Sequence, residues 1–579
     1  MWKTLKPLWP YLWRYRANFA LGLAALAAKD LTAVAAPLVI RSAVDGFSRH
    51  APASQIWRFA AYLTVIALLR GFFQYWMRVI LIGISRDIEY DLRSDLFGRL
   101  VSLSSDFYAR HRTGDIMARA TNDLNAVRMM LGPGVMYWTE TTLTFLLAIA
   151  IMASSDWRLT ALAILPAPLV SVAVIVFGRK IHDRFEQIQA MFSDISSRVQ
   201  ENLSGVRMIR AYAQEAAELK KFNTLNEDYI AQNLQLVRIS GLFDPLLELL
   251  IGATFLIVLW AGGYRVLTGQ LSLGSFVMFN TYMGMLIWPM IAMGWVVNLM
   301  QRGSASFERI WQMMQECPSI AEPASSAPLT SVRGAIEFRG VSVIYPAGAA
   351  IRAIDLEIPA GATVAIVGAT GCGKSTLVSL IPRLLDPTTG SVLLDGTDLR
   401  ELSPQALRRH IGFVPQETFL FSDTIAGNIA LGVENATESN IRRAAELAGL
   451  AADIESFPAG YQTMVGERGI TLSGGQKQRT AIARALLRDP KILILDDALS
   501  SVDTLTEELI LKGLTGVMQG RTVILISHRV STVRQADHIV VLEKGAIVEQ
   551  GAHAQLVASG GYYADLYQKQ LLEEELEAI

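Results

Sequence analysis

Six stretches of apolar residues dominate the first half of the chain. Each is about as long as a helix needs to cross a bilayer, which takes roughly 20 residues. The connections between them alternate between short and long, because the segments 85–132 and 179–239 are long and polar. Their apolar residues recur with helical spacing, so we expect the membrane helices to continue into water there. We place the spans near 17–40, 57–84, 133–153, 157–178, 240–263 and 274–300.

Each long polar segment is expected to be a pair of helical extensions joined by a coupling turn. We place these turns near 106–115 and 211–222. Lys and Arg are frequent in both long segments and in the first sixteen residues, and scarce in the short connections. Positive side chains favour the cytoplasmic side of a membrane. The pattern therefore predicts a multi-pass integral membrane protein with both termini in the cytoplasm.

The two ends of the membrane domain carry their own signals. Residues 1–16 are amphipathic, with Trp and Tyr beside Lys and Arg, and we expect an elbow helix lying in the membrane interface. Residues 318–333 are rich in Pro and Ser, as is typical of a linker, and we expect the linker to span 303–333. From 334 to 579, strand-like apolar runs alternate with helix-periodic ones, which predicts an α/β domain. The membrane domain itself is expected to span 17–302.

Composition agrees with this division. Of the residues, 51% are hydrophobic and only 18% are charged, which is too apolar for an ordinary soluble enzyme of this size. The formal net charge is -1, and no basic tract with interleaved aromatic residues is present, so we expect no nucleic-acid partner. The two cysteines, Cys317 and Cys372, are too few for a disulfide framework and agree with a reducing cytosolic face.

A glycine-rich loop at 368–376 carries the clearest chemistry. It follows a strand at Thr363–Val367 and precedes an apolar helix, the context of a phosphate-binding loop. Backbone amides of such a loop and the helix N-terminus point at phosphate groups. Lys374 is expected to neutralise the phosphates and Ser375 to bind Mg²⁺. The other nucleotide-binding positions expected in the loop are Gly368, Thr370, Gly371, Cys372, Gly373 and Thr376.

Two further residues extend this site. A buried strand at 492–495 ends in Asp496, where a carboxylate suits coordination of Mg²⁺; two carboxylates that merely cap a strand are the alternative. Cys372 most simply replaces another small residue in the loop. It also predicts inhibition by thiol-alkylating reagents, with protection by ATP.

The segment Leu472–Gln476, with the sequence LSGGQ, is similar to the signature sequence of ATP-binding cassette (ABC) proteins. Other motifs stand in the order of that family. Tyr345 resembles the aromatic residue that stacks on adenine, and Gln416 resembles the glutamine that senses Mg²⁺ and contacts the membrane domain. His528 resembles the switch histidine on the γ-phosphate.

The resemblance covers almost the whole chain, including the six spans before the cassette. Asp503 resembles a residue of the loop that signals between two ATP sites, and Gly466–Gly469 resembles the segment that touches the transmission helices of exporters. This order of parts is similar to the half-transporter layout of multidrug-type ABC exporters. The resemblance implies an α-helical membrane domain fused to an α/β P-loop ABC nucleotide-binding domain, with ATP and Mg²⁺ as cofactors, in a bacterial inner membrane.

The signature implies that one cassette is insufficient. In the family it caps the ATP held by a partner's phosphate loop, so two ATP molecules lie between two cassettes. A glycine-rich helix start is physically suited to such a contact. The partner implied is a second ABC half-transporter, and the substrate a small amphipathic compound or lipid. The residues assigned to this cap are Ser473, Gly474, Gly475 and Gln476.

Asp497 follows Asp496 where an ABC ATPase normally carries a glutamate that polarises the attacking water. Asp is shorter by one methylene, and misplacing a catalytic group by about 1 Å can cost on the order of 10²-fold in rate. In heterodimeric bacterial exporters of this family, one subunit carries the non-glutamate residue and the other an altered signature. By that resemblance, this chain is expected to bind ATP, hydrolyse it slowly, and lend its signature to a different partner.

Two other interpretations remain open. In a homodimer, Asp497 would work adequately as the base at both sites. An ATP-gated channel or regulatory subunit is a second alternative, because a slow site suits ATP as a ligand. A pump moves substrate uphill and stops with vanadate, whereas a channel only dissipates gradients. The fused six-span layout disfavours an importer, and the six spans exclude a soluble ABC ATPase.

Ionisable residues inside the expected spans are costly in lipid and mark either ion pairing between helices or contact with substrate. Both interpretations stay open from the sequence. The sixth span also holds several Met, Trp and aromatic residues, which suit a wall for varied apolar compounds and equally suit ordinary packing. The ionisable residues are Lys29, Asp30, Arg70, Arg78, Glu140, Asp244 and Glu248.

Overall fold

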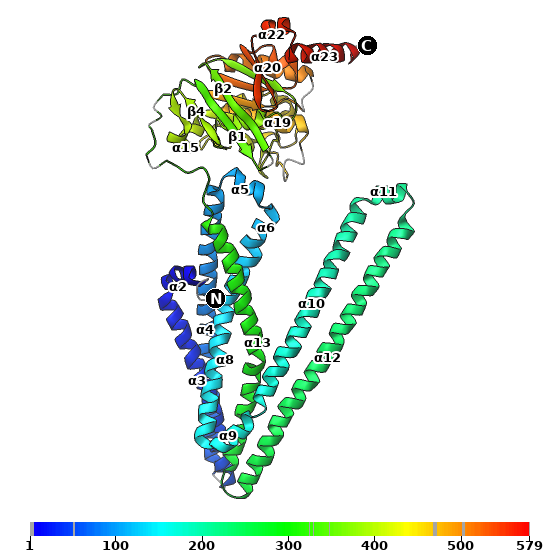
Figure 1. Ribbon diagram of the computed structural model, residues 1–579. Coiled ribbons are helices and arrows are strands. Elements are labelled where there is room, and N and C mark those ends of the chain that lie inside the picture. Colours follow the sequence, from blue (N-terminus) through cyan, green and yellow to red (C-terminus); the bar gives the residue numbers. More distant parts are fainter. Residues whose placement is uncertain are drawn as a thin grey trace. The chain divides into compact units, whose positions relative to one another are not determined.

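The computed structural model describes residues 5–49, 52–323, 325–327, 329, 331–346, 348–466, 472–500 and 504–577 (Figure 1). By its internal contacts the chain forms two units, which we describe separately. Unit 1 comprises Met1–Val101 and Arg112–Glu316, and unit 2 comprises Ser102–His111 and Cys317–Ile579. Unit 1 is entirely helical in its described part, whereas unit 2 contains all of the described strands.

Unit 1 contains six helices long and apolar enough to cross a membrane, which confirms the predicted fold class. All six extend beyond their apolar centres. The fifth, α12, has 53 residues and at 1.5 Å per residue is about 80 Å long, far more than the roughly 30 Å of a bilayer core. The spans are α3 (Arg16–Ser48), α4 (Ala53–Ser102), Thr113–Ser155, Trp157–Ser204, α12 (Glu215–Leu267) and α13 (Leu273–Gln315).

The third span is irregular where it faces α13. Two π-helical stretches, η2 (Arg119–Asp123) and η3 (Met130–Gly134), interrupt its α-helical segments. A π turn widens the helix and reorients side chains. Here it brings Asp123 to α13, where the carboxylate accepts hydrogen bonds from Ser306 Oγ at 2.8 Å and Arg309 Nε at 2.9 Å. The α-helical segments of this span are α6 (Thr113–Ala118), α7 (Leu124–Met129) and α8 (Val135–Ser155).

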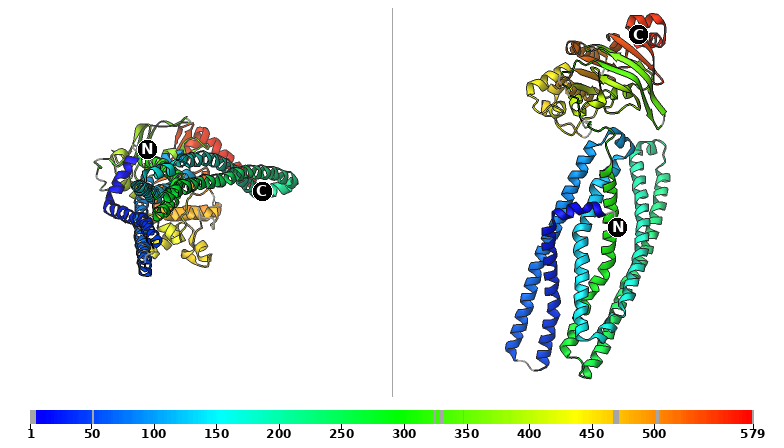
Figure 2. Two further views of the ribbon diagram at one scale, coloured as in Figure 1. Left: turned by 90° about the horizontal axis from the view of Figure 1, so that it is seen from below. Right: turned by 60° about the vertical axis from the view of Figure 1, so that its left-hand side comes forward.

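The fourth and fifth spans form a long helical hairpin. Helices α10 (Ala167–Ser204) and α12 lie side by side, as Figure 1 and the right-hand view of Figure 2 both show. A short helix, α11 (Val206–Ala211), and residues 212–214 join them. The predicted turn near 211–222 is therefore too long, because residues 215–222 already belong to α12. The fourth span begins with α9 (Trp157–Ile164), capped by Asp156, whose side chain accepts from the backbone of Arg158.

The N-terminal segment contacts helix α4, the second membrane span. A 3-10 turn, η1 (Lys6–Leu8), and a short helix, α2 (Trp9–Arg14), replace the single helix predicted over 1–16; residues 1–4 lie outside the described part. Tyr11 donates a hydrogen bond to Asp95 of α4 at 2.6 Å, and Arg14 pairs with Asp91 at 3.1 Å. Polar contacts with α4 thus fix this segment.

The linker is shorter than the sequence predicts. Helix α13 continues to Gln315, so residues 303–315 of the predicted 303–333 linker are helical. Their apolar side chains explain this, because Phe307, Ile310 and Met313 are buried. The chain between 316 and the first strand at Ile336 has no helix or strand among its described residues.

Unit 2 is built on two sheets. The strand order is β2-β1-β4-β5 in an antiparallel sheet, and β10-β9-β3-β8-β7-β6 in a sheet whose core strands are parallel. β3, at the centre of the second sheet, is continuous in sequence with the phosphate loop. The strands are β1 (Ile336–Tyr345), β2 (Gly348–Ile358), β3 (Thr363–Gly368), β4 (Thr389–Leu394), β5 (Thr397–Asp398), β6 (Ile411–Val414), β7 (Ile492–Asp496), β8 (Thr522–Ile526), β9 (His538–Glu543) and β10 (Ala546–Gly551).

Helices cover the parallel sheet, and two apolar clusters fill the space between the layers. The helices of this unit are α14 (Lys374–Ser379), η4 (Leu399–Glu401), α15 (Pro404–Arg409), α16 (Ile425–Ala430), α17 (Glu438–Leu447), α18 (Ala451–Ser456), η5 (Gly460–Gln462), α19 (Gly474–Leu487), α20 (Thr504–Met518), α21 (Val530–Val533), α22 (His553–Ser559) and α23 (Tyr562–Glu577). Unit 2 is thus the α/β domain that the sequence predicts.

A piece of the first long polar segment folds with unit 2. Helix α5 (Ser105–Arg110) occupies the first predicted coupling turn. Ser105 Oγ donates a hydrogen bond to the carbonyl of Leu384 at 3.1 Å, and Ser104 Oγ accepts one from the backbone of Ile320 at 3.2 Å. Phe107 is buried in this unit. The predicted turn at 106–115 thus contains the segment that touches the α/β domain.

Candidate functional site

The loop after β3 has the backbone conformation of a phosphate cradle. Gly371 and Gly373 have φ values of 81° and 105°, in the left-handed region that favours glycine. A side chain at Gly373 would place its Cβ 2.5 Å from the carbonyl of Ala350, so the position has no room for one. The amides of the loop and of the start of α14 are therefore open to an anion.

Lys374 supplies the positive charge of this loop. Its side chain is only 7% exposed, and its ammonium group donates to the carbonyls of Gly368 at 2.8 Å and Ala369 at 3.0 Å. No carboxylate of the described residues forms an ion pair with it. A buried cation without an anionic partner is costly. This charge fits a site whose anion is the phosphate of a nucleotide.

Ser375 and Asp496 meet beneath the loop. Ser375 Oγ donates a hydrogen bond to Asp496 Oδ1 at 3.1 Å, although the two residues are 121 positions apart. Asp496 ends β7 and is 3% exposed. Burial, together with the nearby Asp497 carboxylate, raises the pKa of Asp496. Such a carboxylate favours a neighbouring cation, and oxygen ligands of this kind fit Mg²⁺.

An open cleft of about 240 Å³ joins these residues to the other predicted groups. Asp497, His528 and Gln416 all line it, although they come from three different loops. Ala350 and Ile526 also line it; they belong to no chemical motif, so no pattern in the sequence could have identified them. The predicted site residues that share this cleft are Thr370, Gly371, Gly373, Lys374, Ser375, Thr376, Gln416, Asp496, Asp497 and His528.

Other predicted site residues lie elsewhere in unit 2. Cys372 is buried at 6% exposure, with its sulfur 3.9 Å from the Lys374 ammonium group. Tyr345 is the last residue of β1 and is 43% exposed, as an aromatic side chain that receives a ligand must be. Asp503 and residues 467–469 of the predicted Gly466–Gly469 contact lie outside the described part of the chain.

The backbone at Asp497 is unusual. Its φ is 49°, a left-handed conformation that Asp and Asn adopt more readily than longer side chains. Its amide donates to the carbonyl of Ile526 at 3.0 Å, and its carbonyl accepts from Ser500 Oγ at 2.9 Å. These bonds hold the residue at the cleft wall and leave little freedom to compensate for the short side chain.

The signature residues form the exposed start of a helix away from this cleft. Ser473 caps α19, accepting from the backbone of Gln476 at 3.3 Å, while the Gln476 side chain accepts from the Ser473 backbone at 3.0 Å. Gln476 also donates to Asp453 at 2.9 Å. Ser473 and Gly474 are exposed. A reciprocal cap of this type fixes the helix start and presents its amides outward.

Comparison with known proteins decides the family. The ABC transporter transmembrane region matches residues 19–290, and the ABC transporter domain matches residues 351–500. A probable multidrug resistance ABC transporter ATP-binding/permease protein, YheI of Bacillus subtilis (strain 168), is 37% identical over 99% of this chain and 98% of its own length. The chain belongs to the ABC transporter family.

Further relatives narrow the type of ABC transporter. The multidrug resistance-like ATP-binding protein MdlA of Escherichia coli (strain K12) is 39% identical, covering 98% of this chain and 97% of its own. An ATP-dependent lipid A-core flippase of Syntrophus aciditrophicus (strain SB) is 36% identical over 93% of this chain and 90% of its own. A bacterial Atm1-family ABC exporter with ATP bound superposes with a TM-score of 0.79 at 28% identity, over 96% and 98% of the two chains.

These findings make the chain an ABC exporter half-transporter of the multidrug type. Its cassette binds ATP, and its ATPase activity drives transport across the membrane. ABC exporters of this type function as dimers.

The membrane domain brings three of the predicted ionisable residues together. Lys29 Nζ lies 2.8 Å from Asp30 Oδ1 and 2.5 Å from Glu140 Oε1, so the cluster links α3 to α8. Lys29 and Asp30 are 4% and 1% exposed. Ion pairing between helices therefore accounts for these three. The other four, Arg70, Arg78, Asp244 and Glu248, are exposed in the single chain.

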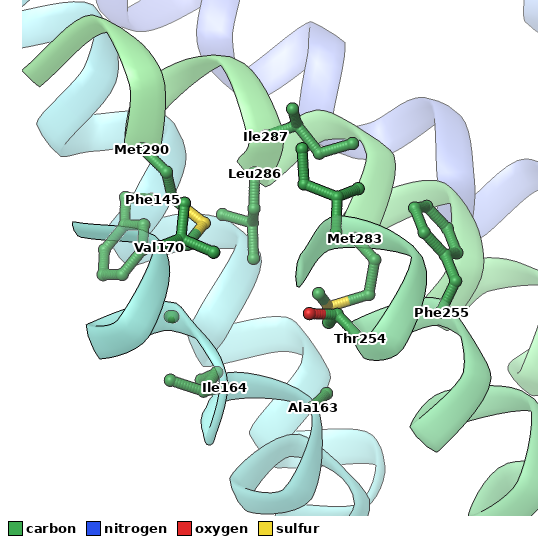
Figure 3. Close-up of a pocket in the computed structure, with 12 residues that line it drawn as sticks. Phe145, Ala163, Ile164, Val170, Thr254, Phe255, Met283, Leu286, Ile287 and Met290 are labelled. Atoms are coloured by element: carbon green, nitrogen blue, oxygen red, sulfur yellow. The ribbon is translucent and has the colours of Figure 1, made fainter. Parts of the chain in front are cut away.

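A small cavity lies between helices α8, α9, α10, α12 and α13. Its volume is about 20 Å³, room for roughly one water molecule, and its walls are apolar apart from Thr254 (Figure 3). Met283 and Met290 of the sixth span point into it, whereas Met278 is fully buried in the packing of α13. Met278 thus serves packing, and the cavity that Met283 and Met290 line is too small for a drug-sized compound, so the wall for varied apolar compounds stays a prediction.

Proposed function

We propose that the chain is the slow-site half of a heterodimeric ABC exporter. The observation that carries this proposal is Asp497, which stands beside an otherwise complete set of ATP-site residues and an intact signature. The side chain is one methylene shorter than glutamate, and the left-handed backbone favours that short side chain. If a second subunit hydrolyses the ATP, this chain can lose its glutamate base. Lys374 and Ser473 are still needed in that case, because one binds ATP and the other completes the partner's site.

In this arrangement the two ATP molecules have different fates. One is held by Lys374 and Ser375 and acts as a long-lived clamp. Ser375, Asp496 and Gln416 would hold its Mg²⁺, which would neutralise phosphate charge. The other is bound by the partner's loop, capped by Ser473 and its glycines, and turns over. His528 contacts the γ-phosphate of the clamped ATP. Hydrolysis at the partner's site then resets the membrane helices from the outward-facing state, since coupling requires ligands that bind the two states differently.

The cargo is proposed to be an amphipathic or hydrophobic compound, either a drug-like molecule or a lipid. Flexible methionine side chains, several of which lie in the sixth span, adapt to different shapes. Two relatives, a probable multidrug resistance transporter and a lipid A-core flippase, support the same class of cargo. We place the protein in a bacterial inner membrane, with both termini and the ATP-binding domain in the cytoplasm.

The test is the ATPase activity of Asp497→Asn in the complex purified from its own cells. Asn keeps the size of Asp and its tolerance of the left-handed backbone, but it cannot act as a base. If the partner's site does the hydrolysis, most of the activity remains. In a homodimer that uses Asp497 at both sites, the rate falls on the order of 10²-fold.

Native mass spectrometry of the same complex provides an independent control. The heterodimer requires a second chain that carries glutamate after its own Walker-type aspartate. A complex that contains two copies of this chain and no other subunit contradicts the proposal, whatever the ATPase result.

A further inference from the structure

The loop that carries His528 is held by a residue of the C-terminal helix. Gln570 of α23 forms two hydrogen bonds to the backbone on either side of Arg529, and one of them is to the histidine itself. Its side-chain amide donates to the carbonyl of His528, and its Oε1 accepts from the backbone amide of Val530 at 2.6 Å. A glutamine amide can donate and accept at once, which suits it to this two-point contact.

The Val530 contact replaces a missing helix cap. Val530 is the first residue of α21, whose early amides have no partner within the helix. The N-cap residue, Arg529, offers no side-chain cap. Gln570 therefore caps α21 from a helix 40 residues later in the chain. An unpaired amide at the buried Val530 would be costly, so the contact has a physical reason to persist.

A second anchor holds the other side of the same loop. Glu507 of α20 is 2% exposed and accepts hydrogen bonds from Arg529 Nη1 and from Thr532 Oγ1. The short segment 528–532 is thus fixed between α20 and α23. Glu507 binds side chains, whereas Gln570 binds the backbone on both sides of Arg529 and directly at the histidine.

Helix α23 is firmly attached, so it can serve as a support. The hydroxyl of the buried Tyr563 lies 2.8 Å from His553 Nδ1. The Glu549 carboxylate accepts hydrogen bonds from the backbone amides of Tyr562 and Tyr563. Gln570 follows Tyr563 by seven residues, two helical turns, and therefore lies on the same face. Gln568 lies on another face and is exposed.

From this geometry we infer that Gln570 is a positioning residue for His528. It fixes the backbone from which the imidazole reaches the γ-phosphate, and so links the C-terminal helix to recognition of ATP over ADP. This inference rests on the proposed role of His528 at the γ-phosphate. It assigns a function to a helix that contributes no residue to the ATP cleft itself.

The experiment measures the nucleotide preference of this chain within the intact complex. The full-length complex is mixed with 8-azido-ATP and increasing concentrations of ATP or ADP before irradiation. The subunits are then separated, and the covalent label on this chain gives the concentration of ATP or ADP that displaces half of the probe. For Gln570→Ala we expect the half-displacing concentration of ATP to rise roughly fivefold, as loss of one or two hydrogen bonds implies, with that of ADP unchanged. The matched control, Gln568→Ala, should change neither.

The double variant Gln570→Ala/His528→Ala distinguishes an effect of Gln570 through His528 from a general effect on the stability of the domain. If Gln570 acts through the histidine, Gln570→Ala adds no further loss of ATP affinity in a His528→Ala background. An additive loss, or an unchanged ATP affinity in folded Gln570→Ala, overturns the inference. If His528→Ala itself leaves the ATP-to-ADP preference unchanged, the proposed role of the histidine fails instead.

Gln570→Glu covers the case in which the alanine variant does not fold. The carboxylate still accepts from Val530 and keeps the cap of α21, but it cannot donate to the carbonyl of His528. We expect its thermal stability in ADP to match the wild type and its ATP affinity to fall. Wild-type ATP affinity in this variant contradicts the inference.

Discussion

The proposed function depends on one residue, Asp497, in an otherwise complete ATP site. The residues predicted to hold phosphate and metal lie together, because a strand end and a loop of fixed length leave Lys374, Ser375 and Asp496 few alternatives. The left-handed backbone at Asp497 was not predictable from its type alone. It follows from the bonds to Ile526 and Ser500, which lie far from it or after it in the chain.

Cys372 gives a prediction at the same scale. Its thiol is 6% exposed behind the phosphate loop, so N-ethylmaleimide should react with it slowly and only when the loop opens. ATP bound to the loop should slow this reaction further and protect the ATPase activity. The measurement is the rate of labelling of Cys372, by peptide mass spectrometry, with and without ATP.

The exposed Cys317 must be removed for a clean result. A Cys317→Ser protein keeps the phosphate loop intact and should show the same protection. Cys372→Ala is the matched control, and its activity should resist the reagent. Equal labelling of Cys372 with and without ATP contradicts the placement of the nucleotide at this loop.

At the scale of helices, the sequence predicts the number of elements better than their ends. Hydrophobic length identifies each span, but the polar extensions of α12 and α13 are stabilised by neighbours that a one-dimensional pattern cannot show. The two π-helical stretches of the third span illustrate this. In η2, Asp123 pairs with Ser306 and Arg309, which lie far away in the sequence, whereas η3 contains Pro133, which has no amide hydrogen to donate within the helix.

The contact between α3 and α8 supports a prediction about stability. Lys29 is the cation of a buried cluster that contains two carboxylates, Asp30 and Glu140. Lys29→Met removes the cation from both acids, and breaking a buried pair costs about 3–5 kcal/mol. We expect a marked fall in the midpoint of thermal unfolding in detergent. Adding Asp30→Asn and Glu140→Gln to Lys29→Met should recover most of it.

The control uses a charge outside this cluster. Glu248 is exposed on α12, so Glu248→Gln should shift the unfolding midpoint much less than Lys29→Met. If Lys29→Met is as stable as the wild type, the cluster does not tie the two helices together. That result would favour the other interpretation of these charges, which is contact with a substrate.

For the whole transporter, the position of the signature outside the cleft leads to the last prediction. Ser473 caps α19 at an exposed site and in the proposed dimer serves the partner's ATP, which is the one that turns over. Ser473→Ala should therefore lower ATPase activity far more than Asp497→Asn does. Loss of a preorganised donor at a reacting phosphate costs on the order of 10²-fold.

Loss of the helix cap itself costs only about 1 kcal/mol of stability. Thr437 provides the matched control, because it caps α17 through the backbone of Asn440 and lines no part of the ATP cleft. Thr437→Ala should lose similar stability and keep its ATPase activity. The comparison of Ser473→Ala with Asp497→Asn then distinguishes the two kinds of dimer. If both variants lose ATPase activity equally and severely, each site needs this chain's own base, as in a homodimer. If only Ser473→Ala loses it severely, the working base belongs to another subunit.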